Sequence, residues 1–235
     1  GDSSRVDIHS YHCDETLFLE LMKKYELNYD YFVIMPHFRT KNLSHISTTE
    51  KVTKVINKIP KENLILLDNS DHKIDGNFNE VYQDYKNDII NALDQGTDSI
   101  TKYNKLTIVY PNTSFYPYPK SILKGFKKYC VQNNFKFEII EEVTEQTEIV
   151  SKNLFITLED NDLVKVVNKI RSSKYDLGID VGVISYNDSP LKQLLGITVI
   201  TTNFSSMGEQ AANMILNNKK EIIKIPINFI KRASL

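Results

Sequence analysis

Short apolar runs alternate with amphipathic helical patterns along most of this 235-residue chain, and that alternation restricts the fold more than any other feature. Asp14, for example, precedes a pattern in which Phe18, Leu21, Met22 and Tyr25 recur at the spacing of one helix face. The apolar runs predict strands at residues 6–11, 31–35, 64–67, 106–110, 135–140, 154–158 and 181–186. Continuous apolar strands separated by helices are typical of parallel sheets covered on both faces. The predicted fold class is therefore α/β with parallel sheets.

A break near residues 101–105 divides the pattern into two successive βα blocks, which indicates two lobes rather than one long sheet. In open parallel sheets, ligands bind outside the carboxyl ends of the strands. This rule selects the segments that directly follow predicted strands: His12, His37, Asn69, Ser114–Lys120, Glu159–Asp160 and Asn187–Asp188.

The charge balance argues against nucleic acid or an anionic membrane as a direct partner of these lobes. The formal net charge is −1, and arginine, which binds phosphates and guanine bidentately, is scarce beside lysine. No apolar run approaches the roughly 20 residues of a membrane span, and no signal-peptide pattern opens the chain. A cytoplasmic location is expected, although a mature secreted form would have the same sequence.

The cluster His9, His12, Cys13 and Asp14 is interpreted as a strand end followed by a helix cap, rather than as a metal site or a Cys–His nucleophile pair. Zinc sites need three or four ligands, and no further pair with ligand spacing follows. With eight glycines in the chain, neither a dinucleotide-binding nor a P-loop fingerprint occurs. Cys13 and Cys130 are expected to be reduced. We therefore expect a binding protein that is not an enzyme and uses no metal or cofactor.

The segment SFYPYPK at residues 114–120 joins a buried strand to a helix and is crowded with aromatic residues and prolines. Ligand sites combine aromatic faces with a few placed polar groups, so Ser114, Tyr116, Tyr118 and Lys120 are candidate ligand contacts. The alternative interpretation is a rigid loop packed for stability. Asn187 and Asp188 follow their strand in the same way, and there the alternative is a plain turn.

Several motifs resemble the sensor domain of LacI-type bacterial repressors when they are taken in order. Residues 181–190 (VGVISYNDSP), 197–203 (ITVITTN) and 207–212 (MGEQAA) are similar to that family's V-x-V-x-G-F-D-D-x-P, T-T-V and M-G-x-x-A segments. The final FIKRAS looks like its L-x-x-R-x-S strand, and residues 123–126 (LKGF) match part of an R-x-x-G-F helix. The resemblance covers nearly the whole chain.

The resemblance implies a periplasmic-binding-protein-like fold of two Rossmann-like lobes with the ligand cleft between them. The chain would cross between lobes near Tyr103, Thr202 and Ile222. The first lobe would comprise residues 1–103 plus 203–222, and the second 104–202 plus 223–235. The family's effectors are sugars, nucleobases or related metabolites, and binding changes the angle between the lobes of a dimer; a homodimer is therefore expected here.

Individual positions depart from the family pattern, and the departures bear on the effector. Asn187 stands where the family has a cleft aspartate, and Ile122 replaces the arginine that would clamp a carboxylate. Asp84 and Glu159 match polar cleft positions. These exchanges and the tyrosines of the aromatic segment favour a neutral monosaccharide. Lys120 could replace the lost positive charge, which would favour an anionic effector instead.

The family's DNA-binding domain has no counterpart in this sequence. Operator DNA would bind only through an absent N-terminal domain, either of helix-turn-helix or of GntR-type winged-helix class. The family's first strand and helix also have no counterpart, and a segment is expected to be missing near Gly1–Ser4. The favoured function is the effector-sensing domain of a bacterial transcription regulator; the alternative is a sugar-binding receptor of a transport or chemotaxis system, which has the same fold.

Overall fold

The computed structural model describes residues 5–235, with Asn69 described for its backbone only. The helices are α1 (Glu15–Tyr25), α2 (Glu50–Ile56), α3 (Tyr85–Gln95), α4 (Thr97–Ile100), α5 (Ser121–Gln132), α6 (Asp160–Arg171), α7 (Pro190–Leu194) and α8 (Phe204–Leu216). The strands are β1 (Phe32–Ile34), β2 (Phe38–Arg39), β3 (His45–Ile46), β4 (Leu64–Asn69), β5 (Asn79–Gln83), β6 (Lys105–Val109), β7 (Lys136–Ile140), β8 (Asn153–Thr157), β9 (Gly182–Tyr186), β10 (Thr198–Thr202), β11 (Ile222–Lys224) and β12 (Ile227–Ile230). Among these helices none has both the length and the apolar character of a membrane span.

The chain divides into two compact units by its internal contacts. Unit 1 comprises residues up to Tyr82 together with Thr113–Pro117 and Glu209–Ile223, and unit 2 comprises Gln83–Asn112, Tyr118–Gly208 and Lys224–Leu235. Residues 83–103 therefore pack with unit 2, whereas the resemblance assigned them to the first lobe. They do so because α3 lies along α5, with Gly125 of α5 against the Lys86 carbonyl. The expected missing segment concerns Gly1–Ser4, which lie outside the described residues.

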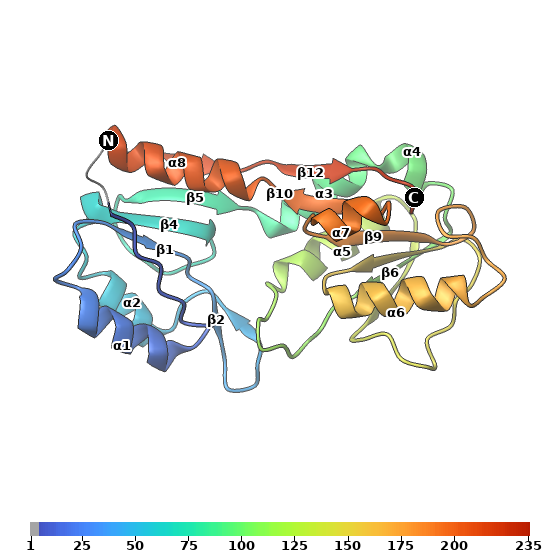
Figure 1. Cartoon of the computed structure of the whole chain (residues 1–235), viewed down its shortest axis with the longest axis horizontal. Helices are drawn as coiled ribbons and strands as arrows, with labels where there is room; N and C mark the ends of the chain where they lie inside the picture. Colours follow the sequence, from blue (N-terminus) through green and yellow to red (C-terminus); the bar gives the residue numbers. More distant parts are fainter. Residues whose placement is uncertain (1–4) are drawn as a thin grey trace. The chain divides into compact units, whose positions relative to one another are not determined.

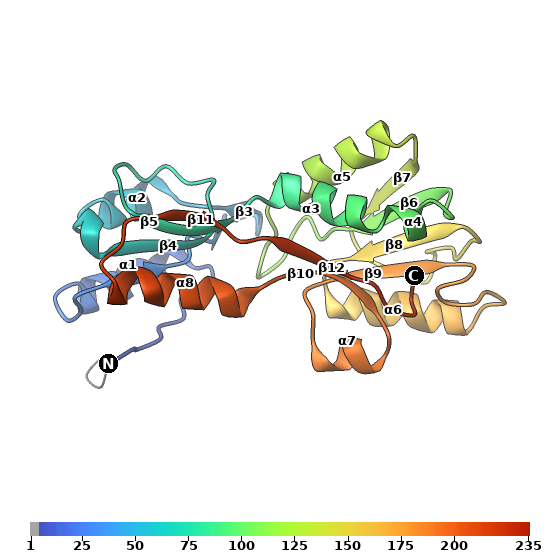
Figure 2. The same ribbon diagram turned by 90° about the horizontal axis from the view of Figure 1, so that it is seen from above.

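Unit 1 is built on a four-stranded sheet in the order β1-β4-β5-β11. β1 runs parallel to β4, with Val33 opposite Ile65. α1 and α2 cover one face of this sheet (Figure 1). Their apolar stripes form one core with the strands, made of Phe18, Met22, Ile34, Phe38, Val52, Ile56, Ile59, Leu64, Leu66, Ile74 and Phe78. The part of α8 that belongs to unit 1 lies on the opposite face, where Ala211 and Met214 are buried (Figure 2).

The strand predicted at residues 6–11 is wrong: this segment is irregular. Its side chains nevertheless alternate. Asp7 and His9 contact Tyr29, and His9 stacks on Tyr25 at 4.3 Å, while Val6 and Ile8 are 83% and 91% exposed. A strand is defined by a hydrogen-bonded neighbour, and among residues 5–235 no strand pairs with this segment. Alternation alone therefore did not make a strand.

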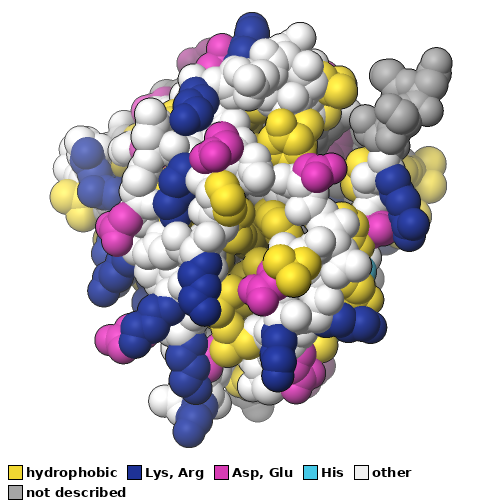
Figure 3. All heavy atoms as spheres, turned by 90° about the vertical axis from the view of Figure 1, so that its left-hand side faces the viewer, with side chains coloured by type: hydrophobic (Ala, Val, Ile, Leu, Met, Phe, Trp, Pro, Cys, Tyr) yellow, Lys and Arg dark blue, Asp and Glu magenta, His cyan; other side chains and the backbone are white. Residues whose placement is uncertain are grey.

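The outer side of β1 is uncovered in the part of the chain that the structure describes. β1 is the last strand of its sheet, and Tyr31, Val33 and Met35 all remain substantially exposed. Figure 3 shows the side of the molecule that lies at the left in Figure 1. Hydrophobic side chains gather in a hollow near the middle of that side, and charged side chains border them. Unit 1 thus leaves apolar surface in contact with water.

Unit 2 is built on a six-stranded sheet in the order β12-β10-β9-β8-β6-β7, parallel except for the antiparallel pair β10–β12. α3 and α5 cover one face through Ile89, Leu93 and Phe126. α6 covers the other through Leu163, Val166 and Ile170. The α/β class and the mostly parallel sheets predicted from the sequence are confirmed.

The helix caps agree with the sequence in one case and differ in another. Asp14 caps α1 as predicted, because its carboxylate accepts the Leu17 N–H at 3.0 Å. Ser47 and Glu50 have the spacing of a capping box, which predicts Ser47 as the cap of α2; this prediction is wrong, because Thr49 is the cap and accepts from the Val52 N–H. Ser47 is buried instead. A run of Ser, Thr and Thr offers three caps, and burial of the first leaves the third to act.

Candidate functional site

The predicted contact His37 lies in a polar cluster of unit 1, at the carboxyl ends of β1 and β4. We call His37, His45 and Asp68 the histidine cluster. The Nδ1 atom of His37 is 3.2 Å from Nε2 of His45 and 3.6 Å from Oδ2 of Asp68. Burial, with His37 nearby, lowers the pKa of His45 to about 3, although Asp68 opposes the shift. The predicted contact Asn69 follows Asp68 directly, but its side chain lies outside the described residues.

Several non-glycine residues of unit 1 lie in the left-handed region of backbone space, and two of these places adjoin predicted contacts. Asp68 has φ +76°, and the consecutive residues His12 and Cys13 have φ +47° and +57°. Such conformations persist only where the surroundings hold them. At the His12–Cys13 turn the holding group is Arg39, which donates to the His12 carbonyl and pairs with Asp14 at 2.9 Å.

The segment Ser114–Pro117, which we call the aromatic loop, contacts unit 1 at several points. The Ser114 N–H donates to the Leu43 carbonyl at 3.2 Å, and the Tyr116 hydroxyl is 3.0 Å from Nδ1 of His12. Nε2 of His37 lies 2.7 Å from the Pro117 carbonyl. Phe115 and Tyr116 stay 55% and 56% exposed. The structure thus brings three predicted contacts, Ser114, Tyr116 and His37, into one group.

Arg39 adds a further contact to the aromatic loop. Its guanidinium carbon lies 4.0 Å from the centre of the Phe115 ring, within the range of a cation–π contact. One face of Phe115 is therefore occupied within the protein, while much of the ring remains open to solvent.

A second group of predicted residues lies in unit 2, where β8 and β9 end. The Tyr118 hydroxyl donates to the Leu158 carbonyl at 3.3 Å, directly before Glu159. Burial raises the pKa of Tyr118 to about 12, and the nearby carboxylates of Glu159, Asp160 and Asp162 add to the shift. Tyr118 is consequently a neutral hydroxyl at physiological pH. Glu159 precedes α6 without capping it through its side chain.

Asn187 is exposed and has φ +58°, a conformation that asparagine adopts more readily than most residues. Lys192 of α7 fixes the backbone at Asn187. Its buried ammonium donates to the Tyr186 and Asn187 carbonyls at 2.7 and 2.9 Å and pairs with Asp160 at 2.8 Å. Lys192 therefore ties the end of β9 to the start of α6 and leaves the Asn187 side chain in solvent.

The aspartate after Asn187 has a structural partner. Asp188 forms a bidentate pair with Arg232 at 2.7 and 2.8 Å, and that pairing, against the opposing effect of burial, lowers the pKa of Asp188 to about 2. Arg232 also donates to the Ile197 carbonyl. The arginine of the final FIKRAS motif thus fixes the loop that carries Asn187.

Asp84 and Lys120, also predicted as contacts, are placed differently. Asp84 caps α3: its carboxylate accepts from the backbone and side chain of Asn87, and these bonds lower its pKa despite burial. Lys120 is exposed and precedes α5 without a capping bond.

The chemistry of the cysteines and acids bears on catalysis and metal binding. Burial raises the pKa of Cys13, and to a greater extent that of Cys130, whereas a nucleophilic cysteine needs a lowered one. Both cysteines are free thiols. Within residues 5–235, no group of three or more His, Cys, Asp or Glu side chains is placed to hold a metal ion.

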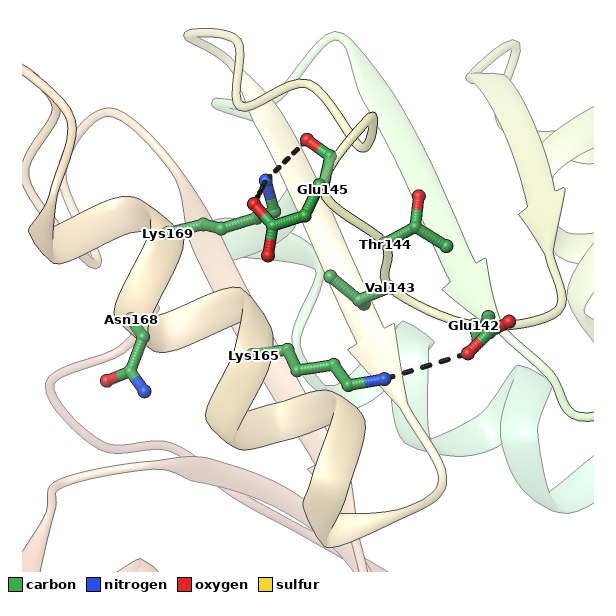
Figure 4. Close-up of a pocket in the computed structure, with 7 residues that line it drawn as sticks. All are labelled: Glu142, Val143, Thr144, Glu145, Lys165, Asn168 and Lys169. Atoms are coloured by element: carbon green, nitrogen blue, oxygen red, sulfur yellow. Dashed lines mark hydrogen bonds and ion pairs between the residues drawn. The ribbon is translucent and has the colours of Figure 1, made fainter.

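A shallow groove in unit 2 lies apart from the predicted contacts. It has a volume of about 460 Å³ and runs between α6 and the segment after β7, over the buried side chain of Val143 (Figure 4). Lys165 and Lys169 extend from α6 toward Glu142 and Glu145, to which they are 3.7 and 4.0 Å distant. Its lining is charged and contains no aromatic side chain.

Comparison with solved structures assigns the fold. The chain is similar to a LacI family transcriptional regulator from Lactobacillus casei with bound glucose, at 15% identity and a TM-score of 0.69, over 98% of this chain and 88% of that one. The fold is that of LacI-type sensor domains. It is also similar to the lac repressor dimer bound to operator and the anti-inducer ONPF, at 15% identity and a TM-score of 0.67, over 96% and 69% of the chains.

A third similar structure is described as a periplasmic binding protein/LacI transcriptional regulator from Alkaliphilus metalliredigens QYMF complexed with D-xylulofuranose. The identity is 14% and the TM-score 0.65, over 94% of this chain and 84% of that one. No protein-family model matches the sequence, and no curated protein matches it. The resemblance inferred from the motifs is therefore confirmed at the level of the fold.

Sequence reasoning missed several residues that shape the two groups. Asp68 directly follows the strand predicted at residues 64–67, so the rule that selected Asn69 could also have selected it. Arg232 belongs to a quoted motif, but nothing in the motif names its partner. No sequence pattern pointed to His45 or Lys192. His45 acts through His37, 8 positions away, and Lys192 acts through backbone carbonyls, which no sequence motif identifies.

Proposed function

We propose that this chain is the ligand-sensing domain of a bacterial transcription regulator and binds a small neutral effector, a monosaccharide. The observation that carries the proposal is the pair of groups at the carboxyl ends of the strands, one with exposed Phe115 and Tyr116 and one with Tyr118, Glu159 and Asn187. Parallel sheets bind ligands at these ends. The first group supplies aromatic rings and the second supplies amide, hydroxyl and carboxylate groups, and a ligand with apolar ring faces and several hydroxyls needs both kinds of contact.

The fold supports this proposal because two similar structures are described with glucose and with D-xylulofuranose. Ile122, which stands where the family has an arginine, is buried in unit 2 and offers no charge to an anion. Lys120 is exposed and is the cation that would serve an anionic effector. Because Ile122 removes the positive charge of the family's arginine, a neutral sugar is proposed over a sugar phosphate.

The test is a thermal-shift screen against neutral monosaccharides, the matching sugar phosphates and nucleobases. A ligand at 100 times its dissociation constant adds about 2.7 kcal/mol to the free energy of unfolding. We expect D-glucose or another neutral monosaccharide to stabilise the wild type, and Asn187→Ala to weaken that stabilisation. Lys128→Ala, an exposed change on α5, is the matched control and should leave it intact.

Sugar phosphates alone stabilising the protein would contradict the choice of a neutral effector. Loss of that stabilisation in Lys120→Ala would then identify the anion contact. Stabilisation by nucleobases alone would retain the sensing role and replace the ligand class.

We further propose that the domain acts as a homodimer and reaches operator DNA through a domain outside this sequence. One similar structure is described as a dimer bound to operator. On α7, Leu191 and Leu194 are 69% and 82% exposed, and Leu195 directly after the helix is half-exposed, so this helix offers an apolar surface. Light scattering should give twice 27.2 kDa for the wild type and a lower mass for Leu194→Lys. A monomeric wild type would contradict the dimer and favour a sugar-binding receptor.

A further inference from the structure

His37 is engaged within the protein at both of its ring nitrogens. A carbonyl oxygen only accepts hydrogen bonds, so the 2.7 Å contact with Pro117 requires a proton on Nε2 of His37. In the neutral ring Nδ1 then carries the lone pair. His45, 3.2 Å away through its Nε2, must donate to it. A directed chain of hydrogen bonds follows, from His45 to His37 to the Pro117 carbonyl.

The surroundings of His37 favour this arrangement. The pKa of His45 is lowered, so His45 stays neutral and can donate through one nitrogen. The backbone N–H of His37 donates to the Tyr11 hydroxyl at 3.2 Å, which fixes the residue from the other side. The Oδ2 atom of Asp68 lies 3.6 Å from Nδ1 of His37.

The aromatic loop gives this chain of bonds a consequence. Pro117 is buried and directly follows Tyr116, whose ring is more than half exposed. The other contacts of the loop act at Ser114, at the carbonyl and ring face of Phe115 and at the Tyr116 hydroxyl, so the Pro117 carbonyl is the contact that fixes the backbone after Tyr116. Exposed rings stack on a ligand at low entropic cost only when the backbone beneath them is fixed.

We infer that His37 is a positioning residue, which sets the two aromatic rings for ligand stacking through Pro117, and that His45 holds it in the required tautomer. This inference rests on the proposed function for its purpose, since it names how the same site is pre-organised. It replaces the expectation that His37 touches the effector, because neither ring nitrogen is left to bind one.

The first test needs no ligand. Long-range ¹H–¹⁵N correlation spectra of the wild-type chain report which imidazole nitrogens carry protons, and with five histidines the signals can be assigned by single variants. We expect the Nε2–H tautomer for both His37 and His45. An Nδ1–H tautomer for His37 would overturn the inference.

Two substitutions separate positioning from contact. His37→Gln keeps an amide N–H where Nε2 stood, and His37→Leu removes both polar atoms. Backbone amide signals of Phe115 and Tyr116 should stay near their wild-type positions in His37→Gln and shift in His37→Leu. Unchanged loop signals in a folded His37→Leu variant would overturn the inference, whether or not any sugar binds.

Affinity for the neutral monosaccharide found in the screen provides the second readout. We expect His37→Gln to bind within about threefold of the wild type and His37→Leu to bind about tenfold more weakly, the effect of one well-placed hydrogen bond. Equal losses in both variants, with the loop signals unmoved, would show direct contact between imidazole and ligand and overturn positioning. If the wild type binds no sugar, the proposed function fails, while the tautomer and loop signals still decide the role of His37. If His37→Leu does not fold, His45→Phe takes its place, because it removes the hydrogen-bond donor to Nδ1 of His37. The amide signals of Phe115 and Tyr116 should shift in that variant too, and unchanged signals would overturn the inference.

Discussion

The two sheets of this protein end differently at their edges. β7 closes one side of the sheet of unit 2 and carries Lys136 and Glu138, with Lys105 of β6 pairing to Glu138 at 2.6 Å. β1 closes one side of the sheet of unit 1 with Phe-Val-Ile and no charge. Charged side chains on an edge strand discourage pairing with another chain, and apolar ones do not. The charged residues of β7 therefore protect that edge from pairing with another chain, and the apolar residues of β1 do not.

The difference extends to the faces of the sheets. In unit 2, both faces are covered by long helices with continuous apolar cores. In unit 1, Ile65 of β4 is fully buried while Val33, its partner in β1, is 46% exposed, so cover on that face stops before the edge. Unit 2 should therefore be the more stable unit, and unit 1 the one that responds to solvent conditions.

The largest expected effect lies in the packing of unit 2. A Cβ atom at Gly125 would come within 2.2 Å of the Lys86 carbonyl, so Gly125→Ala must push α5 away from α3. We expect a loss of about 3 kcal/mol in the free energy of unfolding, measured by denaturant titration, as for an overpacked core. Gly208→Ala is the matched control, since a Cβ there meets nothing within 4 Å. A neutral Gly125→Ala would contradict the close contact of these helices.

Mild acid should weaken unit 1 before unit 2. His45 has a pKa of about 3 in the folded chain and an ordinary value of 6.5 when unfolded. Between these values the unfolded chain binds a proton that the folded chain does not, so the stability of unit 1 falls as the pH falls below 6.5. The slope reaches about 1.4 kcal/mol per pH unit.

Unit 2 has no such loss in the same window. Asp188, with its pKa near 2, loses stabilising charge only below its ordinary value of 3.8, and the raised pKa of the buried Asp88 favours the folded state as the pH falls. Hydrogen exchange should therefore show that the opening free energies of the β4 amides are lower at pH 5 than at pH 6.5, while those of the β8 amides change little. His45→Gln should remove the difference. Equal losses in both strands would contradict the assignment to His45.

The smallest effect concerns the edges themselves. Val33→Lys should change the free energy of unfolding by no more than about 0.5 kcal/mol, because the side chain lies at an exposed edge. It should reduce self-association at high concentration, measured by light scattering. Lys136→Val in β7 is the reciprocal change and should increase self-association. If both variants behave as the wild type, the edges do not differ in the way their sequences indicate.

The sequence predicted the strands and helices that have a complete periodic pattern, such as α1 with its Asp14 cap and β6, β7, β8 and β9 of unit 2, but not β10. It failed at residues 6–11, where the alternation is present but no strand in the described part of the chain pairs with it. The candidate residues after strands stay predictions, and the structure brings two of them, His37 and Tyr118, to the carbonyls of Pro117 and Leu158. The roles of His45, Lys192 and Arg232 were out of reach because each depends on a partner that only the folded chain supplies.

The most direct test of the account is hydrogen exchange of the whole chain with and without a saturating neutral monosaccharide from the thermal-shift screen. We predict slower exchange in residues 113–118, 158–160 and 187–189, which carry the aromatic loop, Glu159 and Asn187. Protection confined to residues 142–149 and 165–173 would contradict the proposed site, since the lining there contains no aromatic side chain and lies apart from the predicted contacts.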